Sequence, residues 1–223
     1  MTKLPLVEFL KPTQFINSNH PTIIEKVNEL IRSPDSPPYK ARTIFYFIRD
    51  QIKYEFKAKF VTEQYIASNI LQNGKGFCIQ KAILFCALAR AAGIPAGIYF
   101  YDIVDHTLPR GFVRLMQTNI LYHHGITALF LNGTWYRYDA TLHLSLVQKN
   151  KFIPVEFSPH QDCLMHDHTL TAQKHIEYLE EYGLFADVSF NQIMGWFRKG
   201  YPQLFQKYHR RQNFPHKNKN QAQ

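Results

Sequence analysis

A cysteine stands at the start of an apolar segment, directly after a glycine-rich turn. The sequence around Cys78 reads GKGFCIQKAILFCALARAAGIPAG over residues 74–97. Its apolar positions recur with helical spacing, so we expect a helix to begin at about Cys78 and to end before Gly93 and Pro95. The N–H groups at a helix N-terminus favour the thiolate, which is the nucleophilic form of cysteine. Cys78 is therefore either a nucleophile or a small core residue, and this segment alone does not decide between them.

A histidine and an aspartate lie in a second pattern, a predicted β-hairpin over residues 121–142. Its turn is the Asn-Gly pair at 132–133, which stands between two runs rich in β-formers and is the strongest short-range hairpin signal. A two-residue turn fixes the register, because the residues on either side of it pair with each other. Counting outward from that pair, His124 and Asp139 become diagonal neighbours on one face, whereas His123 points to the other face.

The spacing of this pair suits general base catalysis. Diagonal side chains on one face of a hairpin are about 7 Å apart at the backbone, within reach of longer side chains. A carboxylate beside an imidazole selects its tautomer and stabilises the imidazolium. Taken alone, however, His124 and Asp139 fit a surface ion pair better, and a slip of one residue would exchange His124 for His123.

The order of cysteine, histidine and aspartate resembles the transglutaminase-like superfamily. The matching elements are GKGFC, ALARAAGIPAG, the strand that opens at His124, and WYRYDAT, and together they cover roughly residues 40–145. The resemblance implies a papain-like core in which Cys78 is the nucleophile, His124 the base and Asp139 the residue that orients the base.

Two positions depart from the usual family pattern. Gly125-Ile126 follows the histidine, where an aromatic residue is common. Gln80-Lys81 follows the cysteine, where an acidic or polar residue is frequent. Neither departure removes the three residues above, but both leave the subfamily and the substrate open.

The resemblance implies a cysteine-dependent acyl-transfer enzyme that acts on amide bonds of peptides or protein side chains through a thioester. Hydrolysis and cross-linking remain open. The Cys78 backbone N–H is the first expected oxyanion donor, and Tyr54 and Gln72 are candidates for the second. The alternative is a non-catalytic protein-binding module that retains the fold. An arylamine acetyltransferase-like enzyme is a third interpretation, disfavoured because no Arg-Gly-Gly precedes the cysteine.

The predicted fold class is α+β, with a papain-like or transglutaminase-like core. The catalytic helix packs on an antiparallel sheet, and N- and C-terminal helices flank it. The long connection at 105–119 is a candidate rim of the substrate cleft, because connections of this length are often functional. The apolar patterns predict a buried strand over 96–104, a loop over 33–40, and further helices over 20–32, 41–53, 64–72, 170–183 and 191–207.

Length and composition predict one globular domain over residues 1–210, with the core at about 40–145. Apolar residues make up 45% of the chain and aromatic residues 15%, which excludes a disordered protein. Seven of the nine net positive charges follow Asp187, where no acidic residue occurs. We therefore expect a basic, disordered tail at 211–223 and, because only this end of the chain is basic, no nucleic acid partner. The partner that the resemblance implies is a peptide or protein substrate.

Three cysteines, an odd number, do not indicate a disulfide framework and favour a reducing compartment. The N-terminal sequence MTKLPLVEFLKPTQF contains no apolar run typical of a Sec signal or a membrane anchor. A cytoplasmic protein is expected, with export by a non-Sec route left open.

One further cluster contains residue types that bind metals. The run PHQDCLMHDH contains soft and imidazole ligands of the kind that hold zinc or copper. No second set with ligand spacing occurs elsewhere in the sequence, so we expect a histidine-rich loop, no metal and no organic cofactor. The four residues are His160, Cys163, His166 and His168.

Overall fold

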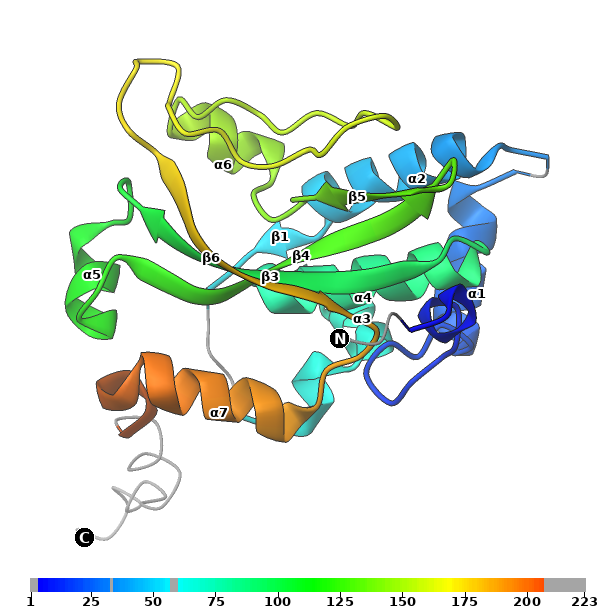
Figure 1. The fold of residues 1–223 in the computed structure, drawn as a ribbon, viewed down its shortest axis with the longest axis horizontal. Coiled ribbons are helices and arrows are strands. Elements are labelled where there is room, and N and C mark those ends of the chain that lie inside the picture. Colours follow the sequence, from blue (N-terminus) through cyan, green and yellow to red (C-terminus); the bar gives the residue numbers. More distant parts are fainter. Residues whose placement is uncertain (1–3, 33, 57–59, 207–223) are drawn as a thin grey trace, which may run out of the picture.

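The computed structural model describes residues 4–32, 34–56 and 60–206. At its centre, four antiparallel strands form one sheet in the order β5-β4-β3-β6 (Figure 1). Helix α4 (Cys78–Ala91) packs against β3 and β4 of this sheet. The α+β class is thereby confirmed. The strands are β3 (Ala96–Asp105), β4 (Ile120–Leu131), β5 (Thr134–Tyr138) and β6 (Ile176–Phe185).

Helix α4 forms the centre of the hydrophobic core. Every residue from Ile79 to Arg90 is buried, because the sheet covers one side of α4 and three N-terminal helices contact it as well. These are α1 (Pro21–Leu30), α2 (Pro37–Tyr46) and α3 (Ala67–Asn73). Shorter elements lie between them: η1 (Leu6–Phe9), the π-helical turn η2 (Phe47–Gln51), η3 (Thr62–Tyr65), and the parallel pair β1 (Lys53–Tyr54) and β2 (Lys75–Gly76).

The hairpin of β4 and β5 has the predicted register. Leu131 pairs with Thr134, and the pairing continues to Thr127 and Tyr138. Asn132 and Gly133 have φ values of 52° and 83°, and a two-residue type I′ turn requires positive φ at both central positions. The turn chemistry therefore set the register, as expected.

Three sequence-based assignments differ from the structure. The helix predicted over 170–183 is wrong, because β6 occupies this region as an edge strand hydrogen-bonded to β3. The 105–119 connection contains the short helix α5 (Arg110–Met116). Helix α2 begins at Pro37, inside the predicted 33–40 loop, because proline is well suited to the first turn of a helix. A further short helix, α6 (Leu144–Lys149), follows β5.

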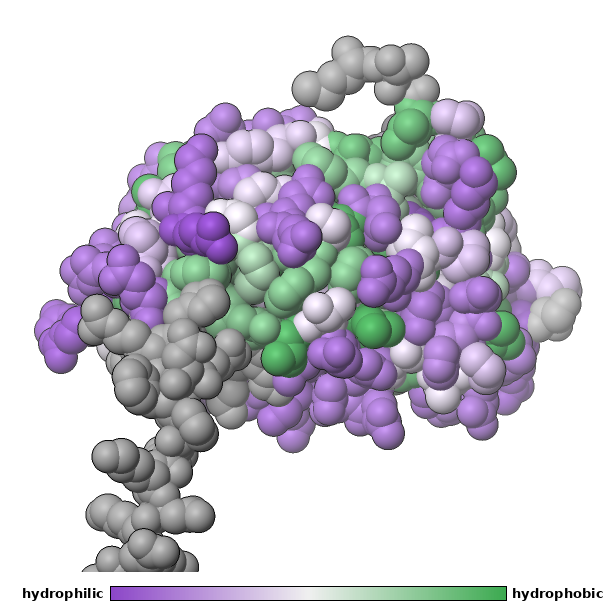
Figure 2. Space-filling view, turned by 90° about the horizontal axis from the view of Figure 1, so that it is seen from below, coloured by the Kyte–Doolittle hydropathy of each residue, from purple (hydrophilic) through white to green (hydrophobic). Residues whose placement is uncertain are grey.

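The C-terminal helix α7 (Phe190–Gly200) is confirmed as amphipathic, with one face buried. It lies below the sheet in the view of Figure 1, and α6 lies above it. Seen from that lower side, apolar and polar residues are mixed on the surface (Figure 2). The predicted tail at 211–223 lies outside the described residues. Among the helices that are described, none is both long enough and apolar enough to cross a membrane.

Candidate active site

Cys78 is the first residue of α4, as predicted. Helix α3 ends at Asn73 and is capped by Gly74, whose φ of 63° is left-handed, and β2 then leads directly into α4. The backbone N–H of Phe77 donates to the Gln80 side-chain oxygen at 3.1 Å, which fixes the first turn of the helix. Cys78 is partly exposed, whereas Cys86 and Cys163 are buried. Cys78 therefore has both the helix-start position and the access that a nucleophile requires.

His124 and Asp139 form a buried hydrogen-bonded pair. His124 Nε2 and Asp139 Oδ2 are 2.7 Å apart, and neither side chain is more than 1% exposed. Burial by itself lowers the pKa of His124, but Asp139 and Cys78 outweigh it and raise this pKa to about 10. Burial raises the pKa of Asp139, but His124 and the Thr141 N–H, which donates to Asp139 at 3.0 Å, lower it. Both directions favour the form of the pair in which His124 is an imidazolium and Asp139 a carboxylate.

The second ring nitrogen of His124, Nδ1, is the one not bonded to Asp139. Nδ1 is buried and finds no hydrogen-bond partner of ordinary geometry in the described part of the chain. Cys78 is near enough to raise the pKa of the ring, and both residues line one small cavity. The structure therefore brings the three predicted residues together, with Nε2 engaged by Asp139 and Nδ1 left available to Cys78.

A glycine allows this close approach. Gly125 follows His124 on β4, and a Cβ at this position would lie 3.2 Å from Ile79 Cα and 3.2 Å from the Phe100 ring. Ile79 is the second residue of α4, so its backbone cannot move without shifting Cys78. Glycine at this position thus lets β4 lie directly against the start of α4.

We expect Gly125→Ala to slow alkylation of Cys78 and to destabilise the fold by about 1–3 kcal/mol, the usual cost of overpacking, because the neighbours of the added Cβ, the Ile79 backbone among them, would have to shift. Rates of Cys78 labelling with iodoacetamide, together with a thermal melt, would measure the effect. The matched control is Gly195→Ala on α7, where an added Cβ has nothing within 4 Å. Equal rates for Gly125→Ala and the native chain would contradict the packing argument.

His123 points away from Asp139, as the register predicted. Its φ is 54°, and the β3–β4 register shifts at this point, which is the geometry of a β-bulge. The His123 ring is stacked between Tyr182 of β6 and Trp196 of α7, at centroid distances of 4.3 and 4.4 Å. Its backbone N–H donates to Asp102 at 2.8 Å. These contacts fix the bulge, and the bulge fixes the direction of the next residue, His124.

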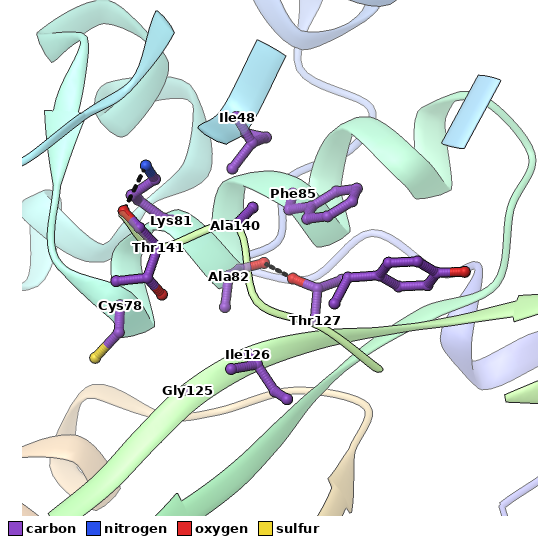
Figure 3. Close-up of a pocket in the computed structure, with 11 residues that line it drawn as sticks. Ile48, Cys78, Lys81, Ala82, Phe85, Gly125, Ile126, Thr127, Ala140 and Thr141 are labelled. Atoms are coloured by element: carbon purple, nitrogen blue, oxygen red, sulfur yellow. Dashed lines mark hydrogen bonds between the residues drawn. The ribbon is translucent and has the colours of Figure 1, made fainter. Parts of the chain in front are cut away.

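A buried lysine supports the Asp139 side of the site, and sequence reasoning did not assign it a role. Lys81 Nζ donates to the carbonyl oxygens of Arg49, Ile52 and Thr141 at 3.2, 2.7 and 2.8 Å. Figure 3 shows the bond to Thr141, which joins α4 to the turn after β5. Burial lowers the pKa of Lys81 to about 7, opposed by nearby carboxylates. The available sequence signal was a charged residue inside an apolar helix.

Of the two candidates for the second oxyanion donor, Tyr54 is the better placed. Tyr54 of β1 pairs with Gly76 of β2, and Gly76 is two residues before Cys78 in the sequence. Tyr54 also lines the small cavity together with Cys78 and His124. Burial and Cys78 raise the pKa of Tyr54 well above its usual range, so its hydroxyl stays protonated and can donate. Gln72 is exposed on α3 and does not line this cavity.

The histidine-rich run does not converge on one point. The buried sulfur of Cys163 accepts a hydrogen bond from the Ser158 N–H at 3.2 Å, and His168 pairs with Asp167 at 2.9 Å. Within residues 4–32, 34–56 and 60–206, no three side chains of the metal-binding types form a group that could hold an ion.

Comparison with known proteins identifies one matching family model and two solved structures of low sequence identity. The two are a candidate cysteine protease from Cytophaga hutchinsonii (18% identity, TM-score 0.47) and a candidate protease from Parabacteroides distasonis ATCC 8503 (16% identity, TM-score 0.38). They match 81% and 64% of this chain, which spans 54% and 26% of theirs. No curated protein matches. The model of the transglutaminase-like superfamily matches residues 24–140. Because this match covers more than half of the chain and includes Cys78, His124 and Asp139, the chain belongs to the transglutaminase-like superfamily.

Proposed function

We propose that the protein is a cysteine-dependent enzyme that cleaves or transfers acyl groups at amide bonds of peptides or protein side chains. Cys78 is the nucleophile, His124 the general base and acid, and Asp139 the residue that orients His124. One observation carries the proposal: a buried imidazole is bonded to a carboxylate through Nε2, and its other nitrogen is available to a partly exposed thiol at a helix start.

The reaction follows from these positions. The Cys78 sulfur attacks the amide carbonyl carbon, and its proton resides on His124 Nδ1. The oxyanion that forms is stabilised by the Cys78 backbone N–H and the Tyr54 hydroxyl. When the C–N bond breaks, His124 gives the proton to the departing nitrogen, and a thioester remains on Cys78. Water then releases an acid, or an amine releases a new amide, and His124 again takes the proton from the attacking group.

Alkylation separates this function from that of a binding module that only retains the fold. Iodoacetamide at pH 6 is expected to modify Cys78 before Cys86 and Cys163. Burial raises the pKa of Cys86 to about 12 and also raises that of Cys163, so both remain thiols, and both are shielded from solvent. Peptide mass spectrometry would locate the label over time. Labelling of Cys78 at the same rate as the other two, or more slowly, would refute its assignment as the nucleophile.

The pH profile tests the roles of His124 and Asp139. Departure of the amine needs a protonated His124, so activity falls as the pH rises through the pKa of His124. Because Asp139 raises this pKa, kcat/KM should stay level through neutral pH and decline only at alkaline pH. Asp139→Asn removes the charge, so the decline should move to lower pH.

The control for this profile is Asp167→Asn, which changes an exposed carboxylate bonded to His168. Its alkaline limb should coincide with that of the native protein. An Asp139→Asn profile with an unmoved alkaline limb would show that Asp139 does not act through His124.

A further inference from the structure

A cavity of about 380 Å³ adjoins the proposed catalytic residues. Tyr54, His124 and Thr141 line part of it, so a group bound there would touch the imidazole. Its volume falls within the range of about 300–1,000 Å³ that is typical of ligand pockets. The mechanism above uses the reacting groups beside this cavity but assigns nothing to the cavity itself.

Two connecting segments supply most of the wall. The first is the 105–119 connection, expected from the sequence to form a rim, and it contributes side chains from α5 and the residues before it. The second follows Asp139 and includes α6. The side chains from both segments are mainly apolar and include Leu108, Phe112, Met116, Leu142, Leu146 and Phe152.

The polar groups at the cavity are few and mostly engaged. Asp105 Oδ1 accepts hydrogen bonds from the Thr107 N–H at 2.8 Å and from the Thr107 hydroxyl at 2.7 Å, so these two residues satisfy each other. Lys149 is exposed to solvent. Phe152 is held in place by stacking on the His175 ring, with centroids 4.1 Å apart. Away from His124 and Tyr54, the cavity therefore offers mainly apolar surface.

We propose that this cavity binds a large apolar side chain, aromatic or long aliphatic, of the amide substrate. The proposal rests on the proposed function, because it takes His124 as the catalytic base that the bound substrate must reach. In an apolar pocket, each missing methylene is worth roughly 10- to 200-fold in selectivity. Substrates with phenylalanine or leucine beside the reacting amide should therefore be preferred over those with alanine.

Binding can be measured without any reaction. The sequence contains four methionines; Met116 and Met165 line the cavity, and Met194 packs in the core from α7. In the full chain with ¹³C-labelled methionine methyl groups, N-acetylphenylalanine amide should shift the Met116 and Met165 signals saturably and leave Met194 unchanged. N-acetylalanine amide should bind at least about tenfold more weakly. No shift, or equal affinity for both amides, would overturn the proposal.

Variants tie these signals to the cavity. Leu146→Trp on α6 should fill it and abolish the shifts, whereas Gln148→Ala on the same helix, at an exposed position that does not line the cavity, should preserve them. The Met194 signal reports whether each variant remains folded. If Leu146→Trp fails to fold, Leu108→Gln on the opposite segment replaces it, with weaker binding of the phenylalanine amide expected. Undiminished shifts in the folded variant would contradict binding at this site.

Alkylation kinetics then separate the cavity from the catalytic assignment. The chloromethyl ketone of acetylphenylalanine should alkylate Cys78, with loss of chloride, roughly 10- to 200-fold faster than that of acetylalanine. Iodoacetamide serves as the reference for thiol reactivity. Reactive Cys78 with no preference between the ketones, and no methionine shifts, would refute the cavity proposal and leave the function standing. Methionine shifts with an unreactive Cys78 would support the cavity and refute the function.

Discussion

Replacing Cys78 by serine is expected to reduce amide cleavage by roughly 10³-fold or more, the scale seen when a catalytic nucleophile is removed. An alcohol does not ionise in the range where a thiol does, so His124 would have no thiolate to pair with. The unfolding temperature should change little, because Cys78 is partly exposed. Initial rates on a mixed peptide library and a thermal melt of the same preparation measure the two effects.

Cys86→Ala is the matched control for this variant. Cys86 lies on the same helix and is fully buried, so its loss should reduce stability by about 1 kcal/mol and leave the rate nearly unchanged. Cleavage that persists in Cys78→Ser would mean that another group performs the reaction, and a non-enzymatic role for the fold would again be open.

Ending the chain after residue 189 should destabilise the protein by several kcal/mol, which is a large part of the roughly 5–15 kcal/mol that stabilises a typical domain. The deletion removes α7 and the helical turn after it. Burying each large apolar side chain contributes about 1.5–3 kcal/mol. The truncation also removes the edge contact between the Phe197 ring and the ring of Phe77, the residue before Cys78. The buried side chains lost are Ile193, Met194, Phe197, Tyr201, Leu204 and Phe205.

Chemical denaturation of two truncated chains tests this expectation. Deletion of residues 212–223 is the control, because their sequence is polar and basic and should contribute little buried apolar surface. These residues lie outside the described structure, so the prediction for them rests on sequence alone. No loss on ending the chain at 189 would make α7 a detachable element, and a large loss from the short deletion would make the tail structural.

The elements that carry the proposed site could be predicted because their signals are local. The Asn132-Gly133 turn sets a register that brings His124 to Asp139 within one hairpin. The start of α4 at Cys78 follows from a glycine turn before it and a helical apolar period after it. In both cases the determining residues are close in sequence to the residues that they position.

Strand β6 could not be predicted from local sequence signals. Its register against β3 shifts at two places, so inward and outward side chains do not alternate along it, and three consecutive residues at 179–181 are exposed. A Glu- and Leu-containing segment without alternation reads as a helix, but pairing with a distant strand decides its conformation. The short helix α5 was also not predicted, because it has only seven residues and includes Gly111, so its helical pattern is weak.

The parts of the site that sequence reasoning missed are contacts between distant segments. Lys81 meets the carbonyl oxygens of Arg49, Ile52 and Thr141 only in the folded chain. The stacking of His123 between β6 and α7 likewise has no local pattern. The cavity beside His124 is a gap between segments rather than a run of residues. The length of the 105–119 connection indicated one of its walls, but no local pattern indicated the second wall at α6.

The walls of that cavity have a consequence for how such a protein can diverge. One wall belongs to the connection from β3 to β4, and the other to the connection from β5 to β6. The proposed reacting groups lie elsewhere, on α4, within β4 and directly after β5. The lengths and side chains of the two connections can therefore change while the hairpin register and the helix start stay the same. A lineage with this architecture can acquire new substrates through insertions and replacements in two loops, without evolving a new reaction centre.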